Sequence, residues 1–317
     1  MKRGALVVPE EFATHYRAHA FEITGLLCWA KAMDWDVLRI DEDIGGYDVY
    51  MTNISSTETE YISVIRMAEP GAKVVACFDY GFDVVGQYFS NLERVKTVLK
   101  RADRVFSVNR NQLAWLRLMM PDKKMAYCPH PADVENIRKY RRKIEERDLG
   151  VGAMWHQYDN YHVQSLEVIK GVERLLGRNI NKCLLGLKGR LMAERGISIP
   201  ATSIPMTGDG DKMVPLDPEY ERYVKMVPQG MGWDSVFPYV GVQPWYDVLG
   251  RFAVTLDMYT VNSFGRFGID SAGVGVPCVA STKQDSSEIL WPTTKVNPYE
   301  PVGAVKMLAR LITDREF

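Results

Sequence analysis

The sequence predicts an α/β protein with two doubly wound domains, each built on a Rossmann-like parallel sheet. Three observations support this fold class. Short β-rich apolar runs alternate with helical segments along most of the chain, which is typical of parallel sheets covered by helices on both faces. The alternation stops at Pro129 and Pro131 and then restarts. The chain has 317 residues, enough for two domains of about 150 residues each.

The first half opens with the apolar run Gly4–Val8, which has the character of a buried strand, and a long helical pattern follows at 15–33. The same order then repeats up to the two prolines. In this half we expect further strands at 36–40, 48–52, 73–78, 104–108 and 125–128, and further helices at 57–68, 84–100 and 111–119. Ligands of such sheets bind beyond the carboxyl ends of the strands, so polar residues directly after strands are the candidate site residues.

The basic run that follows the prolines, IRKYRRKIEER at 137–147, is expected to form a solvated linker helix of mixed charge. The predicted domains are therefore 1–133 and 148–317, joined by a linker at 134–147. In the second domain we expect strands at 149–154, 182–187, 236–240, 254–258 and 277–280, and helices at 163–176, 218–226, 245–252, 267–272 and 298–313.

The composition is that of a soluble globular protein, with 25% charged and 46% apolar residues. A net charge of -1 gives no general attraction to nucleic acid or anionic lipid. The five cysteines are widely spaced and form no CxxC pair, so we expect reduced core cysteines and no metal site. The sequence shows neither a secretory signal nor an apolar run of about 18 residues, and we expect a cytoplasmic protein without a membrane span.

The stretch at 256–281, LDMYTVNSFGRFGIDSAGVGVPCVAS, contains a strand end, a loop, a helix and another strand. Asn262, Ser263 and Gly265 form the loop and helix start. The helix N-terminus of such a unit points to the carboxyl end of the sheet, where N–H groups and the helix dipole favour a phosphate. A tight turn alone would also explain the glycine. Asp270 can face the same site, or it can lie on the polar surface of the helix.

Other polar residues directly follow predicted strands, where they could neutralise a phosphate or act as general acids and bases. Each could equally be a solvated surface residue. GxGxxG after the first strand, GxxxxGK[ST] and GxSxG are all absent, which argues against a simple dehydrogenase, a P-loop kinase and a serine hydrolase. The candidates outside the stretch at 256–281 are Glu11, His15, Asp79, His156, Lys188 and Arg190.

The stretch at 256–281 resembles the motif of the two-domain nucleotide-sugar glycosyltransferases of the GT-B fold, especially group 1, also called family 4. Members carry an acidic residue, Phe-Gly, a second acidic residue eight positions after the first, and then Gly-x-Pro before a β-run. The corresponding residues here are Asn262, Phe264, Gly265, Asp270, Gly275 and Pro277. The resemblance covers most of the chain, with clear motifs from about 236 to 298.

The resemblance implies that the two domains face each other across a cleft and that the second domain binds a nucleoside-diphosphate sugar. Its diphosphate would lie on the backbone amides from Phe264 to Arg266, and its ribose on Asp270. The scheme needs no cofactor and no metal. The nucleotide base would lie near Gly241, Val242 and Gln243.

Two departures from the family pattern concern the donor. Asn262 stands where the family has its first acidic residue, so a carboxylate role there is reduced to hydrogen bonding. The Arg and Lys with which the family grips the diphosphate are not evident, and His156, Lys188 or Arg190 are the candidates to replace them.

By this resemblance the protein is a glycosyltransferase that moves a sugar, with retention of configuration, to a hydroxyl of a glycan, a lipid-linked or a small-molecule acceptor. Asn262 would lie near the donor sugar. If the reaction inverts configuration instead, Asp79, Glu11 or His15 would activate the acceptor.

Two alternatives remain open. A transferase of the same fold could act on hydroxylated bases in DNA, which the basic runs at 94–104 and 138–147 motivate. The protein could also bind sugar nucleotides without catalysis, which Asn262 motivates.

Overall fold

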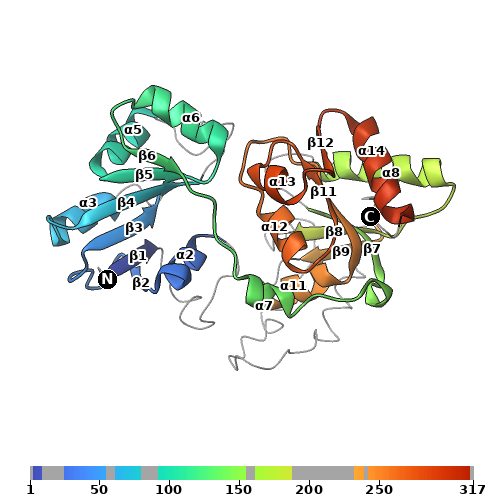
Figure 1. Ribbon diagram of the computed structural model, residues 1–317, viewed down its shortest axis with the longest axis horizontal. Coiled ribbons are helices and arrows are strands. Elements are labelled where there is room, and N and C mark those ends of the chain that lie inside the picture. The colour runs from blue at the N-terminus through green and yellow to red at the C-terminus, as the bar shows by residue number, and fades with distance from the viewer. Residues whose placement is uncertain are drawn as a thin grey trace. The chain divides into compact units, whose positions relative to one another are not determined.

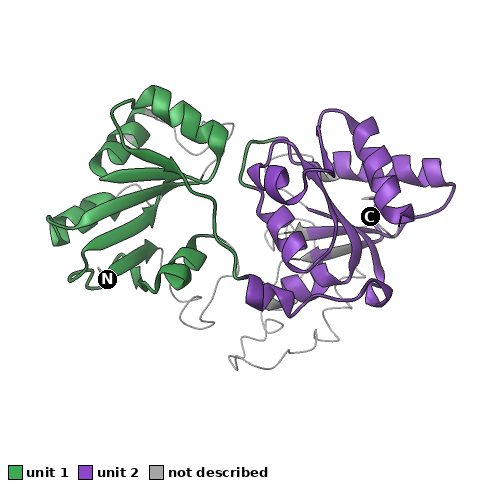
Figure 2. Cartoon of the chain, viewed as in Figure 1, with its two compact units in different colours: residues 1–133, 261–264 green, residues 134–260, 265–317 purple. Residues whose placement is uncertain are grey.

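The computed structural model describes residues 3–8, 25–54, 61–79, 92–154, 161–187, 232–238 and 242–314. The chain divides into two compact units, coloured separately in Figure 2. Unit 1 contains residues 1–133 and also the short segment Val261–Phe264. Unit 2 contains residues 134–260 and 265–317. The residues predicted as a linker therefore lie in unit 2, and one loop of the second half lies in unit 1.

Unit 1 is built on a parallel sheet of six strands in the order β2-β1-β3-β4-β5-β6 (Figure 1). The strands are short and mostly buried, because the sheet is covered by helices and its apolar runs have no exposed face. Its strands are β1 (Gly4–Val8), β2 (Asp36–Arg39), β3 (Val49–Asn53), β4 (Lys73–Phe78), β5 (Arg104–Ser107) and β6 (Met125–Tyr127). Its helices are α2 (Leu26–Met33), α3 (Tyr61–Ala68), α5 (Leu92–Arg101) and α6 (Arg110–Met119).

Unit 2 repeats the design with six parallel strands in the order β12-β11-β10-β7-β8-β9. Helices α8 and α14 pack together against β7 and β10, while α11 and α12 pack together, and in Figure 1 the sheet lies between the two groups. The strands are β7 (Leu149–Met154), β8 (Lys182–Leu187), β9 (Ser235–Pro238), β10 (Phe252–Asp257), β11 (Cys278–Ser281) and β12 (Lys295–Val296). The helices are α7 (Val134–Arg138), the 3-10 turn η1 (Ile144–Glu146), α8 (Tyr161–Leu176), α11 (Val242–Gly250), α12 (Arg266–Gly273), α13 (Asp285–Leu290) and α14 (Pro301–Thr313).

The prediction of two parallel-sheet α/β halves is confirmed, with β1, β4, β7 and β8 at the predicted bounds. The solvated linker helix at 137–147 is a wrong prediction. Only α7 and η1 form there, and Ile137 is fully buried with its side chain packed against Gly273. The Arg142 guanidinium donates to Asp247 at 2.7 Å. The run is basic for its length, but it is partly fixed to unit 2 by packing and ion pairing.

The cysteines are free thiols, and Cys28, Cys77, Cys183 and Cys278 are buried in the two cores. Burial raises the pKa of Cys183 to about 12, so this thiol is protonated and unreactive near neutral pH. The expectation of reduced core cysteines is therefore confirmed for these four residues, of which Cys77, Cys183 and Cys278 lie in strands and Cys28 lies in helix α2.

Candidate functional site

Helix α12 begins at Arg266, directly after Gly265, at the carboxyl edge of the unit 2 sheet. Gly265 is the N-cap residue, has a φ of 83° and makes no capping hydrogen bond through a side chain. A Cβ atom at this position would come within 2.5 Å of Ser286 Oγ and 2.7 Å of Gln284 Cβ. Only glycine combines this left-handed backbone with so close an approach. The N-cap residue therefore closes none of the backbone N–H groups in the first turn of α12 with a side chain, and open N–H groups at a helix start suit a phosphate.

Two residues that follow β11 hold Gly265 in place. Ser286 Oγ donates to the Gly265 carbonyl oxygen at 2.8 Å, and Gln284 Nε2 donates to Asp257 Oδ2 at 2.6 Å. Gln284 and Asp257 are each 1% exposed. An ionised carboxylate can only accept hydrogen bonds, so the Gln284 amide faces Asp257 with its nitrogen. The amide oxygen Oε1 therefore faces Gly265. The sequence interpretation missed these three residues, although Asp257 at a strand end and a polar run directly after a strand were visible signals.

Asp270 lies one turn into α12 and is 2% exposed. Its carboxylate accepts from Trp245 Nε1 at 3.1 Å and from the Tyr246 hydroxyl at 2.8 Å, both on α11. Arg266 Nε lies 3.9 Å from Asp270 Oδ2. Asp270 is thus not a polar surface residue: it joins α11 to α12, and any ligand hydroxyl would share it with these two donors.

The segment Val261–Phe264 is assigned to unit 1 (Figure 2), and its polar contacts are made there. Asn262 Oδ1 accepts from Asn111 Nδ2 at 2.9 Å. The Ser263 carbonyl oxygen accepts from Asn109 Nδ2 at 3.0 Å. Asn109 is 1% exposed and caps α6 by accepting from the Gln112 N–H at 2.9 Å. The segment therefore rests on a capped helix start that follows β5.

Asp79, which follows β4, pairs with a histidine that the sequence interpretation missed. His130 Nε2 lies 2.8 Å from Asp79 Oδ2, and the His130 ring meets the Phe264 ring edge-on at 5.9 Å. His130 Nδ1 is buried and has no hydrogen-bond partner within the described residues. If Nε2 carries the proton toward the carboxylate, Nδ1 presents a lone pair, which is the arrangement of a general base.

Several predicted residues lie outside the described part of the chain: Glu11, His15, His156, Lys188, Arg190 and Gly241. Val242 and Gln243 form the start of α11. A cation that was not predicted is Lys283, which follows β11. Its Nζ lies 5.5 Å from the centre of the Tyr299 ring, and the Tyr299 hydroxyl donates to the Thr260 carbonyl oxygen at 3.4 Å. Lys283 is thus a positive charge at the same strand end as Gln284.

No family model and no curated protein matches this sequence. Solved structures do match. Sucrose-phosphate synthase from Thermosynechococcus elongatus is 13% identical with a TM-score of 0.62, over 99% of this chain and 90% of the other. An α-glucosyltransferase in complex with UDP and a 13-mer DNA containing a HMU base is 11% identical with a TM-score of 0.60, over 98% and 89%. A UDP-forming trehalose-phosphate synthase from Burkholderia xenovorans is 14% identical with a TM-score of 0.55, over 96% and 71%.

The chain has the GT-B fold of these glycosyltransferases. At 11 to 14% identity the likeness establishes the fold and no more, and it confirms the predicted fold class. Among the described residues, no group of three His, Cys, Asp or Glu side chains is placed to hold a metal ion. Within the same residues, no helix combines the length and apolar character needed to cross a bilayer.

Proposed function

We propose that the protein is a glycosyltransferase that moves a sugar from a nucleoside-diphosphate sugar to an acceptor hydroxyl with retention of configuration. The observation that carries the proposal is the start of α12. Gly265 has a left-handed backbone, lacks a side-chain cap and is enclosed by Gln284 and Ser286. When the bond between sugar and phosphate breaks, its electron pair stays on the departing diphosphate. The N–H groups of this turn would stabilise that added negative charge.

The charges around this turn support a diphosphate as the ligand. Arg266 is the first residue of α12, with a side chain 44% exposed, and Lys283 lies at the neighbouring strand end. Both can neutralise phosphate oxygens in place of the basic residues that the family carries elsewhere. Asp270 would bind the ribose only by sharing its oxygens with α11, so we assign it first to holding the turn in position.

The position of Asn262 bears on the reaction. A neutral amide can hydrogen-bond the donor sugar but cannot stabilise a positive charge that develops on it. In a retaining transfer the departing phosphate can take the acceptor proton, and the Asp79–His130 pair is not required as a base. In an inverting transfer that pair would be a candidate base, since its imidazole and carboxylate are 2.8 Å apart. The anomeric configuration of the product separates the two.

The test is a thermal-shift screen with nucleoside mono- and diphosphates and their hexose conjugates, followed by NMR of the product formed by any donor that binds. A ligand that binds only the folded state raises the melting temperature, by an amount that grows with the ratio of its concentration to its Kd. We expect diphosphates to raise it more than monophosphates, and the sugar to keep its anomeric configuration. Absence of any nucleotide response would contradict the proposal, and binding without turnover would favour the inactive binding protein.

A second candidate is transfer of the sugar to a hydroxylated base in DNA. Its support is the DNA-bound α-glucosyltransferase, which matches 98% of this chain and 89% of its own length. The trehalose-phosphate synthase matches only 71% of its length. Sucrose-phosphate synthase matches over 99% of this chain and 90% of its own length. The share of each chain that is matched therefore does not decide between a sugar-phosphate and a DNA acceptor.

A further inference from the structure

Positive charge is concentrated in one segment of unit 1. Residues 93–124 contain nine basic side chains and three acidic ones, a surplus of six in a chain whose net charge is -1. The remainder of the chain is therefore acidic overall. The segment spans α5, β5, α6 and the turn before β6, so it ends at the edge strand of the unit 1 sheet.

Within and beside this segment, exposed cations gather where neighbouring strands begin. Lys73 starts β4, Arg104 starts β5 and Lys124 precedes β6, and these three strands are adjacent in the sheet. The Lys124 carbonyl oxygen accepts from Val105 N at 3.1 Å, which sets Lys124 beside Arg104. Adjacent strands lie about 4.8 Å apart, so these residues form a row. We call the row, together with the exposed end of α5, the basic edge; its residues are Lys73, Lys100, Arg101, Arg104 and Lys124.

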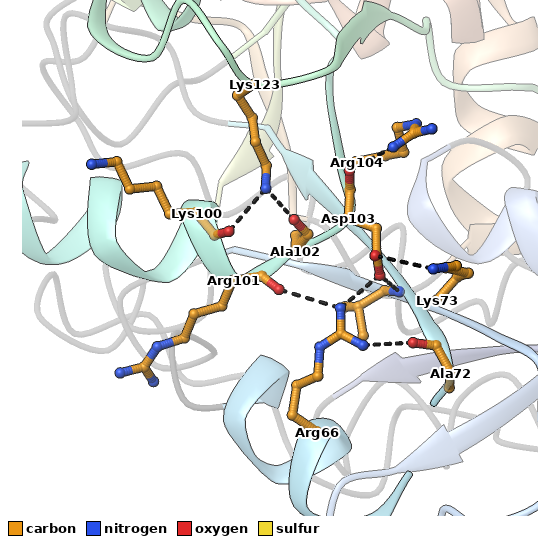
Figure 3. A network of polar contacts seen from close by, with 10 residues as sticks. Arg66, Ala72, Lys73, Lys100, Arg101, Ala102, Asp103, Arg104 and Lys123 are labelled. Carbon is orange, nitrogen blue, oxygen red and sulfur yellow. Dashed lines mark hydrogen bonds and ion pairs between the residues drawn. The ribbon is translucent and has the colours of Figure 1, made fainter. Parts of the chain in front are cut away.

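The carboxylate of Asp103, which lies beside the basic edge, is neutralised by its own partners. Asp103 accepts from Val74 N at 2.8 Å and from Arg66 at 2.6 Å (Figure 3). Burial opposes these hydrogen bonds but is outweighed, and the pKa of Asp103 lies below its ordinary value. Lys123 donates to the carbonyl oxygen of Lys100 at 2.9 Å and so caps the end of α5. In Figure 3 the Lys100 and Arg101 side chains point away from this network.

The second basic run, at 137–147, differs from the basic edge in how its charges are used. Arg142 is paired with Asp247 at 2.7 Å, and Arg147 donates to the Gly275 carbonyl oxygen at 2.7 Å. Glu145 and Glu146 lie within the run and offset part of its charge. Arg142 and Arg147 thus hold the segment on unit 2, while Arg138, Lys139 and Lys143 are exposed. In the basic edge, Lys73 is ion-paired with Asp103 at 3.6 Å, and Lys100, Arg104 and Lys124 are exposed.

We propose that the basic edge binds the phosphate backbone of a nucleic acid. Exposed cations that are locally in excess match a polyanion, whose condensed counterions they release. The cations come from three strands and one helix end, not from one amphipathic helix of the kind that binds membrane surfaces. The inference deepens the DNA-directed function proposed above, and adds a contact at the amino ends of the strands, opposite the ends where Asp79 and Asn109 lie.

The test is binding of a fluorescent 20-bp DNA duplex, measured by anisotropy from 50 to 300 mM salt without any nucleotide-sugar. The edge variant is Lys100→Glu/Arg104→Glu/Lys124→Glu. The matched control is Arg138→Glu/Lys139→Glu/Lys143→Glu, which makes the same charge change at exposed positions of the second run. We expect the edge variant to lose roughly tenfold or more in affinity at 100 mM salt, and its slope of log K against log salt to fall by about 2.7. The control variant is expected to keep the wild-type affinity and the wild-type slope of log K against log salt.

Equal losses in the two triple variants would show a general charge effect and overturn the proposal, as would wild-type protein that does not bind the duplex. Binding to phosphatidylserine vesicles without binding to the duplex would also overturn it and identify a membrane surface instead. The melting temperature of each variant checks its folding, and the corresponding glutamine triple replaces the edge variant if that variant is unfolded. Because no donor is present, failure here leaves the sugar-transfer proposal intact.

Discussion

The two units start a helix at the carboxyl edge of a parallel sheet in opposite ways. In unit 1, α6 follows β5 and its N-cap residue Asn109 closes the first turn by accepting from the Gln112 N–H. In unit 2, α12 follows β10 and its N-cap is Gly265, which has a left-handed backbone and no side chain. One helix start is closed by its own sequence. The other leaves its N–H groups without a side-chain cap.

The difference separates a helix start that is capped by its own side chain from the one at which we propose that a phosphate binds. A side-chain cap is worth about 1 kcal/mol relative to alanine but only a few tenths of a kcal/mol relative to glycine, which also takes the left-handed backbone without strain, so Gly265 omits the cap at a small cost in stability. Unit 2 compensates from outside the turn. Ser286 bonds the Gly265 carbonyl, Asp257 fixes Gln284, and Asp270 bonds α12 to α11. A helix start that is braced in this way would hold its N–H groups in position for the phosphate that we propose it binds.

The largest effect is expected from the brace at Asp270. Asp270→Ala leaves the buried Trp245 and Tyr246 donors without their acceptor, which should lower the free energy of unfolding by about 2 to 4 kcal/mol in urea denaturation. Asp270→Asn keeps one acceptor oxygen and should cost less. Nucleotide-sugar affinity of the folded Asn variant then tests the ribose role separately. Unfolding unchanged in the Ala variant would show that the bonds to α11 do not support α12.

Gly265→Ala tests the open helix start itself. The new Cβ would meet Ser286 and Gln284, and the left-handed backbone alone costs about 1 to 2 kcal/mol for a residue other than glycine. We expect the nucleoside diphosphate that binds the wild-type protein to bind at least about tenfold more weakly, because a shift of this turn moves the N–H groups. Gly303→Ala is the matched control, since Gly303 lies in α14 with nothing within 4 Å of its added Cβ. The control should bind normally, and equal binding by both variants would contradict the site.

The comparison also shows what the sequence could and could not predict. β1, β4, β7 and β8 are continuous apolar runs between polar residues, so their bounds follow from local pattern alone. The motif at 262–270 located the start of α12 correctly. One short element escaped: α13 has six residues, too few for any periodicity to appear.

Partners distant in sequence could not be predicted. His130 lies between two prolines and looked like part of a domain boundary, because its partner Asp79 is 51 positions away. The spacing of Asp270 from Asn262 was visible in the sequence, but the two α11 side chains that occupy its oxygens were not. Gln284 was missed for the same reason, since its role depends on a carboxylate 27 positions earlier.

The smallest effects come from the closed helix start, where two neighbouring asparagines contact the segment Val261–Phe264. Asn109→Ala removes the cap of α6 and the bond to the Ser263 carbonyl, which should cost about 1 kcal/mol in urea denaturation. Asn111→Ala removes only an exposed bond to Asn262 and should cost about 0.5 kcal/mol or less. Both variants release the same segment at one bond each, part-buried for Asn109 and exposed for Asn111, so the difference between them contains the cap together with this difference in burial. Equal costs would show that α6 does not depend on its side-chain cap, and the contrast between a closed and an open helix start would then lose its energetic basis.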